Sequence, residues 1–247
     1  MKTTNVIKAV GLVVAALGAA PVAAQQGDWE YDVSVYLFMP ETTTAIATPV
    51  GTIESELSFS DALSNLDFAF MGAFGASNGR WSFLADYMYT DLSFGNPPPG
   101  PVFSSIDTSM TTQILSGYAA YRVYEDSNAQ VDLAAGFRWF NVKSSLTLQP
   151  VPPGRTSSVD ESWVDPVIGI KARYKFSDRW TGTAFFDYGG FESGEKTWQA
   201  LLTADYAIND KWVLRGGYRY ITVDHAIGAN SLSLSQSGPV FGATYRF

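Results

Sequence analysis

The sequence predicts an all-β fold: an antiparallel up-and-down barrel of about ten strands that crosses a membrane. Three observations lead to this prediction: an apolar N-terminal segment typical of an export signal, an apolar period of two along the rest of the chain, and connections that alternate between short turns and long loops. A barrel of eight strands is the architectural alternative.

Composition limits the class of protein. The 247 residues are 46% hydrophobic and 16% charged, which excludes an intrinsically disordered chain and fits a single domain. The 24 acidic residues outnumber the 16 basic ones, so binding to nucleic acid, which requires cations against phosphates, is not expected. The chain contains no cysteine, and no disulfide can stabilise it after export.

The first 24 residues form the predicted export signal. Lys2 and Lys8 give a positive start, residues 9–20 are uncharged, and Val22–Ala24 supply small residues for cleavage. The apolar run is shorter than the roughly 18 residues needed to span a bilayer, which argues against a retained membrane helix. We therefore predict a cleaved signal peptide at 1–24 and a barrel domain at 25–247.

Strands are predicted from one end of the remaining chain to the other. In residues 81–89 the aromatic side chains fall on one face and polar ones on the other, and 131–139, 180–188 and 212–220 repeat the pattern. A helical period would put Asp and Arg on the apolar stripe, so a helix is rejected. The predicted strands are 29–39, 66–77, 80–93, 108–123, 130–143, 163–176, 179–189, 196–208, 211–223 and 234–247.

Short turns occur on one side of the predicted sheet. Three of them combine turn residues, a cation and a tryptophan that opens the next strand: Asn78–Trp81, Ser177–Trp180 and Asn209–Trp212. Residues 125–129 form the fourth short turn. Asn78–Gly79 is a strong two-residue hairpin signal, which predicts that Ala76 pairs with Trp81.

The connections on the other side are long: 40–65, 95–107, 144–162, 189–195 and 224–233. A transmembrane barrel sorts its connections in this way, whereas a soluble β-sandwich has no reason to do so. Within the first connection, residues 50–60 alternate and are predicted to extend a hairpin above the membrane. Residues 60–64 are predicted to form a helical turn capped by Ser60.

The end of the chain carries a resemblance. With the export signal and the tryptophan-initiated strands, a last strand that has Phe241, Ala243, Tyr245 and Phe247 on one face resembles the small outer-membrane β-barrel proteins of Gram-negative bacteria. In that family the terminal aromatic strand is read by the outer-membrane assembly machinery. The resemblance, which covers nearly the whole mature chain, implies that Phe241, Tyr245 and Phe247 are the assembly signal and that outer-membrane lipids surround the barrel.

A second stretch is similar to uncharacterised porin-like, OmpA-like members of the same family. It comprises residues 59–67, with the sequence FSDALSNLD, followed by Gly79–Trp81 and Asp86. This similarity names no substrate.

With the aromatic face toward lipid, the charged residues of the strands point into the lumen. The inward acids are Glu30, Asp32, Asp67, Asp86, Asp132, Asp165, Asp187 and Asp205, and the inward bases are Arg122, Arg138, Lys171, Arg173, Arg215, Arg219 and Arg246. Lipid-facing residues should pair across each turn. Matching Val123 with Val131 sets Arg122 opposite Asp132, and matching Ile208 with Trp212 sets Asp205 opposite Arg215.

Two interpretations of the charged lumen remain open at this point. Salt bridges can fill it, or Arg138, Arg215 and Arg219 can face Asp86, Asp187 and Asp165 across a narrow water path. Small residues at inward positions favour free space inside the barrel: Ala69, Ala73, Ala134, Gly136, Gly169, Gly217 and Gly242. The leading functional hypothesis is a narrow porin-like passive channel for small polar solutes, formed by a monomer.

Two other functions are weighed against the channel. A structural anchor or adhesin acting through its surface loops is the alternative. An outer-membrane hydrolase using His225 is less favoured, because adjacent Asp224 points to the opposite side of an extended chain and leaves His225 as a solvated loop residue. A calcium site is another candidate, formed by the carboxylates of Asp160, Glu161 and Asp165. Solvated carboxylates at the rim of a barrel are more common than a calcium site. We expect no enzyme activity, cofactor or metal.

Overall fold

The computed structural model describes residues 29–48, 51–96, 105–149 and 155–247. The predicted signal peptide lies outside the described residues. Within them, none of the helical structure is long and apolar enough to cross a membrane.

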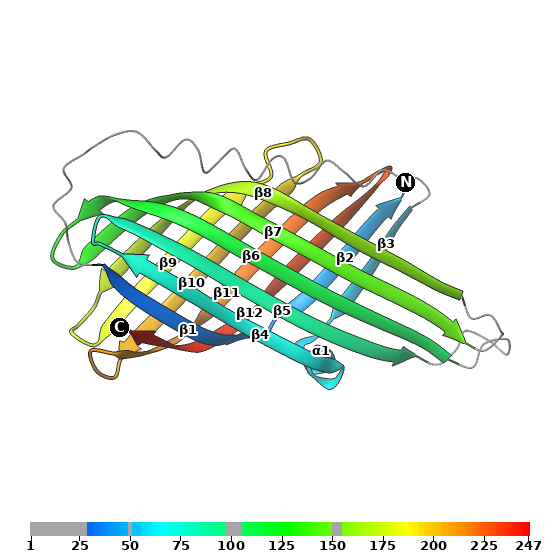
Figure 1. Ribbon diagram of the computed structural model, residues 1–247, viewed down its shortest axis with the longest axis horizontal. Helices are drawn as coiled ribbons and strands as arrows, with labels where there is room; N and C mark the ends of the chain where they lie inside the picture. The colour runs from blue at the N-terminus through cyan, green and yellow to red at the C-terminus, as the bar shows by residue number, and fades with distance from the viewer. Residues whose placement is uncertain (1–28, 49–50, 97–104, 150–154) are drawn as a thin grey trace.

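The chain forms one antiparallel sheet that closes on itself (Figure 1). β1 pairs with β4 on one side and with β12 on the other, so ten of the twelve strands complete a barrel. This confirms the predicted fold class, with ten strands and not eight. The ten barrel strands are β1 (Glu30–Phe38), β4 (Leu66–Ser77), β5 (Trp81–Asn96), β6 (Ser105–Glu125), β7 (Ala129–Gln149), β8 (Arg155–Lys175), β9 (Trp180–Gly189), β10 (Lys196–Ala207), β11 (Trp212–Ile227) and β12 (Asn230–Arg246).

Several strands continue far beyond the predicted ends. β6, β7 and β8 have 21 residues each, about 70 Å at roughly 3.4 Å per residue, whereas a tilted crossing needs about 10 residues. The prediction of long loops at 144–162 and 224–233 was therefore wrong over much of both segments, because the strand ladders continue above the membrane. Figure 1 shows β6–β8 projecting past the other strands, with β5 alongside them. The predicted proline-rich tips, 97–99 and 150–153, lie outside the described residues.

The first long connection contains a hairpin and a short helix. β2 (Glu41–Thr48) pairs with β12 just beyond β1, and β3 (Gly51–Leu57) pairs with β2. A hairpin was predicted here, but its first strand begins at residue 41 and not at 50. α1 (Phe59–Ser64) follows, and its cap is Ser58, not Ser60, because Asp61 N–H donates to Ser58 Oγ at 3.2 Å.

The aromatic side chains of the predicted outward face point outward, as the alternation predicts. At the short-turn end, each tryptophan that opens a strand packs against a tyrosine of the neighbouring strand: Trp81 on Tyr121, Trp180 on Tyr206 and Trp212 on Tyr245, with ring centroids 4.9, 4.9 and 5.0 Å apart. The preceding cation reaches the same tyrosine: Arg80 Nε is 3.1 Å from Tyr121 Oη, Arg179 Nη1 is 3.2 Å from Tyr206 Oη, and Lys211 Nζ is 6.0 Å from the centre of the Tyr245 ring. The turn repeat thus builds one of the aromatic girdles expected at a membrane interface.

The register at the first short turn differs from the prediction. Ala76 pairs with Phe83, not Trp81, so the two central turn residues are Gly79 and Arg80. Asn78 Oδ1 accepts the N–H of Trp81 at 2.8 Å and thereby fixes the turn, in which Gly79 adopts a positive φ of 84°. The shift is two residues, so the inward and outward faces are unchanged.

The two predicted charge pairs are confirmed by the strand register. Arg122 lies opposite Asp132, and Asp205 lies opposite Arg215. Val123, however, does not pair with Val131, because a β-bulge between Arg122 and Tyr124 inserts an extra residue there.

Replacing Gly79 by alanine tests the turn geometry. A Cβ at a φ of 84° is strained, so we expect Gly79→Ala to lower the free energy of unfolding by about 1 kcal/mol, measured by urea titration of the barrel in lipid vesicles. Gly216→Ala is the matched control, since its Cβ would approach Phe241 no closer than 3.5 Å. Equal losses in both variants would contradict the turn assignment.

Candidate functional site

The predicted charged residues lie in the barrel interior and form two layers. The layer nearer the short turns contains Arg122, Asp132, Asp205 and Arg215, and the central layer contains Asp86, Arg138, Asp187 and Arg219. The inward placement follows from the parity of the strands, because each of these residues alternates with lipid-facing neighbours.

The layer near the short turns joins neighbouring strands. Arg122 forms a short ion pair with Asp132, and its Nη1 lies 3.2 Å from Glu125 Oε1. Arg215 Nε donates to Asp205 Oδ1 at 2.7 Å. The Arg122–Asp132 and Arg215–Asp205 pairs are each made across one turn, between neighbouring strands, so they line the wall without crossing the lumen.

The central layer begins at Arg138, whose side chain is fully buried. Its Nη2 donates to Asp187 Oδ2 at 2.7 Å and to Tyr118 Oη at 2.8 Å. Its Nε and Nη1 donate to Ser116 and Thr197, at 3.1 and 3.0 Å. All three guanidinium nitrogens are therefore satisfied by groups on β6, β9 and β10, which removes most of the cost of burying the cation.

A second arginine completes the central layer from the other side. Arg219 Nη2 donates to Asp86 Oδ2 at 2.9 Å, and its Nη1 donates to Tyr36 Oη at 3.0 Å. Gln199 links the two arginines, because its Oε1 accepts from Arg219 Nε at 2.6 Å and its Nε2 donates to Asp187 Oδ2 at 3.1 Å. The result is one continuous network from β1 and β5 to β7, which we call the central network.

The four charged members of the central network were predicted to point inward, whereas its neutral members were not predicted. Tyr36, Tyr118 and Gln199 occupy inward positions of their strands, as the period of two shows. Their signal in the sequence is a polar side chain at an inward position, which neutral and charged residues share. Asp165 lies opposite Arg138 in the register of β7 and β8, as expected, and its Oδ2 also accepts a hydrogen bond from Trp163 Nε1 at 3.2 Å.

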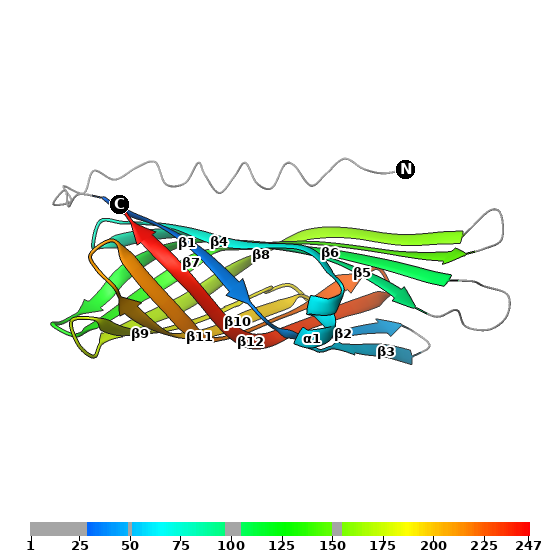
Figure 2. The same ribbon diagram turned by 90° about the horizontal axis from the view of Figure 1, so that it is seen from below.

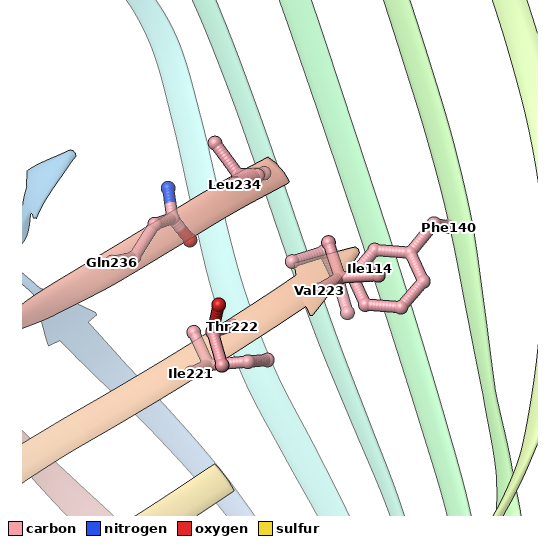
Figure 3. Close-up of a pocket in the computed structure, with 7 residues that line it drawn as sticks. All are labelled: Ile114, Phe140, Ile221, Thr222, Val223, Leu234 and Gln236. Atoms are coloured by element: carbon pink, nitrogen blue, oxygen red, sulfur yellow. The ribbon is translucent and has the colours of Figure 1, made fainter. Parts of the chain in front are cut away.

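An apolar layer lies beyond the central network, toward the projecting strands. Its members are no more than 8% exposed: Phe38, Met71, Met88, Ile114, Phe140, Val142, Trp163, Ile221, Val223, Leu232, Leu234 and Val240. Figure 3 shows part of this layer, with the ring of Phe140 beside Ile114 and Val223. These residues lie on the inward face that was expected to be polar, so in this half of the barrel both faces of several strands are apolar.

The small inward residues do not leave the space expected of them. A Cβ on Gly217 would lie 2.1 Å from the Leu202 carbonyl oxygen, and one on Gly242 would lie 2.6 Å from Tyr36 Cβ. Curvature of the wall brings neighbouring strands against these glycines. The expectation of free space at these two positions was therefore wrong.

His225 is not the solvated loop residue that was predicted. It lies on β11, stacks on Trp163 with ring centroids 3.9 Å apart, and has its Nδ1 2.6 Å from Glu195 Oε2. Glu195 also accepts the N–H of Ala226 at 3.2 Å, so it holds the segment before β10 against β11. Glu195, not Asp224, orients the imidazole. No described serine or threonine hydroxyl donates to His225 Nε2, so the Glu–His pair lacks the nucleophile of a hydrolase.

The acidic residues considered for calcium do not converge. Asp160 forms a pair with Lys143 at 3.2 Å, and this contact, with a bond from Asn141, lowers the pKa of Asp160. Asp160 and Asp165 belong to opposite faces of β8 by parity. Among the described residues, no group of three or more acidic or histidine side chains is arranged for a metal ion.

The C-terminal aromatic residues lie on the outward face of β12 and just after it. Phe241 is largely exposed to the membrane side, and the rings of Tyr245 and Phe247 meet edge to face at 5.1 Å. Their proposed use as an assembly signal depends on this exposure.

Removal of Arg138 tests whether the central network stabilises the barrel. Arg138→Ala leaves the fully buried Asp187 without its cation, so we expect the free energy of unfolding to fall by about 3–5 kcal/mol. The exposed pair of Lys143 and Asp160 is the comparison, and Lys143→Ala should cost less than about 1 kcal/mol. Urea unfolding in vesicles measures both. Similar small losses would show that the buried pair is not structural.

The Glu195 contact has its own test. His225→Phe keeps a ring on Trp163 but removes the bond to Glu195, so the segment containing Glu192 should be cleaved several times faster by a glutamate-specific protease. Asp224→Ala, a change at the neighbouring position, should leave the rate unchanged. Unaltered cleavage of His225→Phe would mean that Glu195 does not hold this segment.

Comparison with known proteins supports the fold. No family model and no curated protein matches the sequence. Among solved structures, the outer membrane protease OmpT of Escherichia coli is similar with a TM-score of 0.62, at 10% identity over 90% of this chain and 97% of that chain. The translocator domain of the autotransporter NalP of Neisseria meningitidis has a TM-score of 0.47, at 14% identity over 91% of this chain and 90% of that one. The chain has the fold of the outer-membrane β-barrel proteins.

Proposed function

We propose that this protein is an outer-membrane barrel with a closed lumen that acts at the outer surface, as an anchor for its projecting strands. The observation that carries the proposal is the central network. It crosses the interior between opposite walls, and Arg138, Asp187 and Arg219 are at most 2% exposed within it. This favours the anchor hypothesis over the narrow passive channel.

Passage of a polar solute through this interior meets two obstacles. The solute must first separate charge pairs whose hydrogen-bonding groups are almost all satisfied. It must then cross the apolar layer, where Phe140 and Ile221 are buried and offer no polar partner. Filling of the lumen by side chains is the usual condition of small barrels.

The projecting strands supply a working surface. A ladder of hydrogen bonds runs across their outer face, from Tyr87 to Gln113, then to Asn141 and Asp160. It marks a change from an apolar to a polar exterior, and the strands continue beyond it. Paired strands form a stiffer platform than free loops, which suits presentation of a binding surface.

The location follows from the fold. OmpT is named as an outer membrane protein, and the shared architecture supports an outer-membrane position for this chain. Cleavage of residues 1–24, recognition of Phe241, Tyr245 and Phe247 by the assembly machinery, and a monomeric barrel belong to the same proposal. Surrounding lipids are the partner that the outward aromatic surface implies.

Conductance is the direct test of the proposed closed lumen. The purified barrel in planar bilayers should give no discrete channels at moderate voltage, because the central network blocks the path. Arg80→Ala, a change in a turn, should behave in the same way as the natural chain.

The proposal would be contradicted if the natural chain formed discrete channels whose ion preference is altered by Arg219→Ala or Arg215→Ala. That result would favour the passive-channel hypothesis. Cleavage of lipid or peptide that is lost in His225→Ala would favour a hydrolase instead.

A further inference from the structure

A second feature of the interior is a cavity of about 440 Å³ between α1 and the apolar layer. Leu57, Phe59, Leu63 and Leu66 line it from the hairpin, α1 and the start of β4. Met71, Met88, Leu92, Met110 and Ile114 line it from the barrel wall. The cavity therefore lies in the outer half of the barrel, on the far side of the central network from the short turns.

The lining is mostly apolar, with eight neutral polar residues among its 23 members. None of the described residues that line the cavity carries a charge, and its polar members are threonines, serines and Gln236. Pockets of roughly 300–1,000 Å³ with this kind of lining hold small molecules. An apolar cavity of about 150 Å³ already stays dry and binds benzene, so a cavity of this size and lining favours an apolar molecule over water.

The cavity extends to the lipid-facing side at one seam of the barrel. The β1–β4 ladder ends at the pair of Val35 and Gly72, whereas β1 continues to Phe38 with β12 as its strand partner. Across the seam, the Phe38 N–H donates to the Met71 Sδ of β4 at 3.1 Å. Leu37, next to the end of this ladder, points outward and is 48% exposed, yet it also lines the cavity. Leu63 of α1, which is 57% exposed, does the same.

α1 is placed beside this seam. Figure 2 shows α1 between the β2–β3 hairpin on one side and the start of β4 with the neighbouring β5 on the other. The helix is not part of the strand ladder, and none of its residues is buried. It covers the cavity, but it is not joined to β1 by backbone hydrogen bonds and therefore does not close the seam.

We propose that this cavity binds one neutral hydrocarbon-like molecule, such as a small fused aromatic compound, which enters from the membrane between β1 and β4 past α1. The inference goes beyond the anchor function and does not depend on it. A fatty acid or another anion fits less well, because its charge would find no cation among the described lining residues.

Naphthalene binding tests the proposal on the full-length barrel. Radiolabelled naphthalene is titrated into lipid nanodiscs with and without the protein, so that partitioning into lipid is subtracted. We expect saturable binding of one molecule per barrel. Ala69→Trp fills the cavity from β4 and should weaken this binding at least tenfold.

The matched control is Ala135→Trp, the same change on the exposed outer face of β7, which should leave the affinity within twofold. Circular dichroism verifies that both variants are folded. If Ala69→Trp does not fold, Thr90→Phe replaces it, because Thr90 also lines the cavity.

Three results would overturn the proposal. One is binding that never saturates above empty nanodiscs. Another is an equal loss in the cavity and control variants. The third is that the natural chain binds no naphthalene but holds a lipid tightly, and that Ala69→Trp displaces this lipid. That result would show that an acyl tail fills the cavity. Because none of these readouts is a conductance, failure here is separate from failure of the closed-lumen proposal.

Discussion

Hydrocarbon cannot form hydrogen bonds with the backbone, and the rest of this structure depends on that constraint. Strands in the membrane pair on both sides, which the chain achieves by joining β1 to β12, except at the end of β1, where residues 36–38 pair with β12 but not with β4. Closure then sorts the side chains by parity. Aromatic and aliphatic residues on one face of each strand contact lipid. Residues on the other face point into an interior that is too narrow for a wide channel.

That interior is divided along the barrel axis. Near the short turns and at the centre, arginines and aspartates satisfy one another, with Tyr36, Tyr118 and Gln199 completing the contacts. Beyond them the interior becomes apolar and then opens into the cavity beside α1. We propose that the polar half closes the barrel and that the apolar half holds a molecule that prefers hydrocarbon to water.

The fold was predictable because parity and turn chemistry are local properties of the sequence. The charge pairs Arg122–Asp132 and Asp205–Arg215 follow from counting residues across a turn. Contacts between distant strands do not follow from such counting. The ion pair of Arg219 and Asp86 joins residues 133 positions apart. The bond between His225 and Glu195 depends on the continuation of β11 above the membrane. The cavity depends on where the β1–β4 ladder stops, which no local pattern of the sequence indicates.

If the lumen is closed as proposed, water does not pass the middle of the barrel. The chain has no cysteine, so Ser116→Cys places a single thiol beside Arg138 at a position that is 1% exposed. Its rate of modification by a charged methanethiosulfonate reagent is compared with that of Ser127→Cys in an exposed turn and Ser60→Cys on α1. We expect both control thiols to react readily and the Ser116→Cys thiol to remain unmodified from either side of the membrane. Rapid modification at position 116 would contradict the closed lumen.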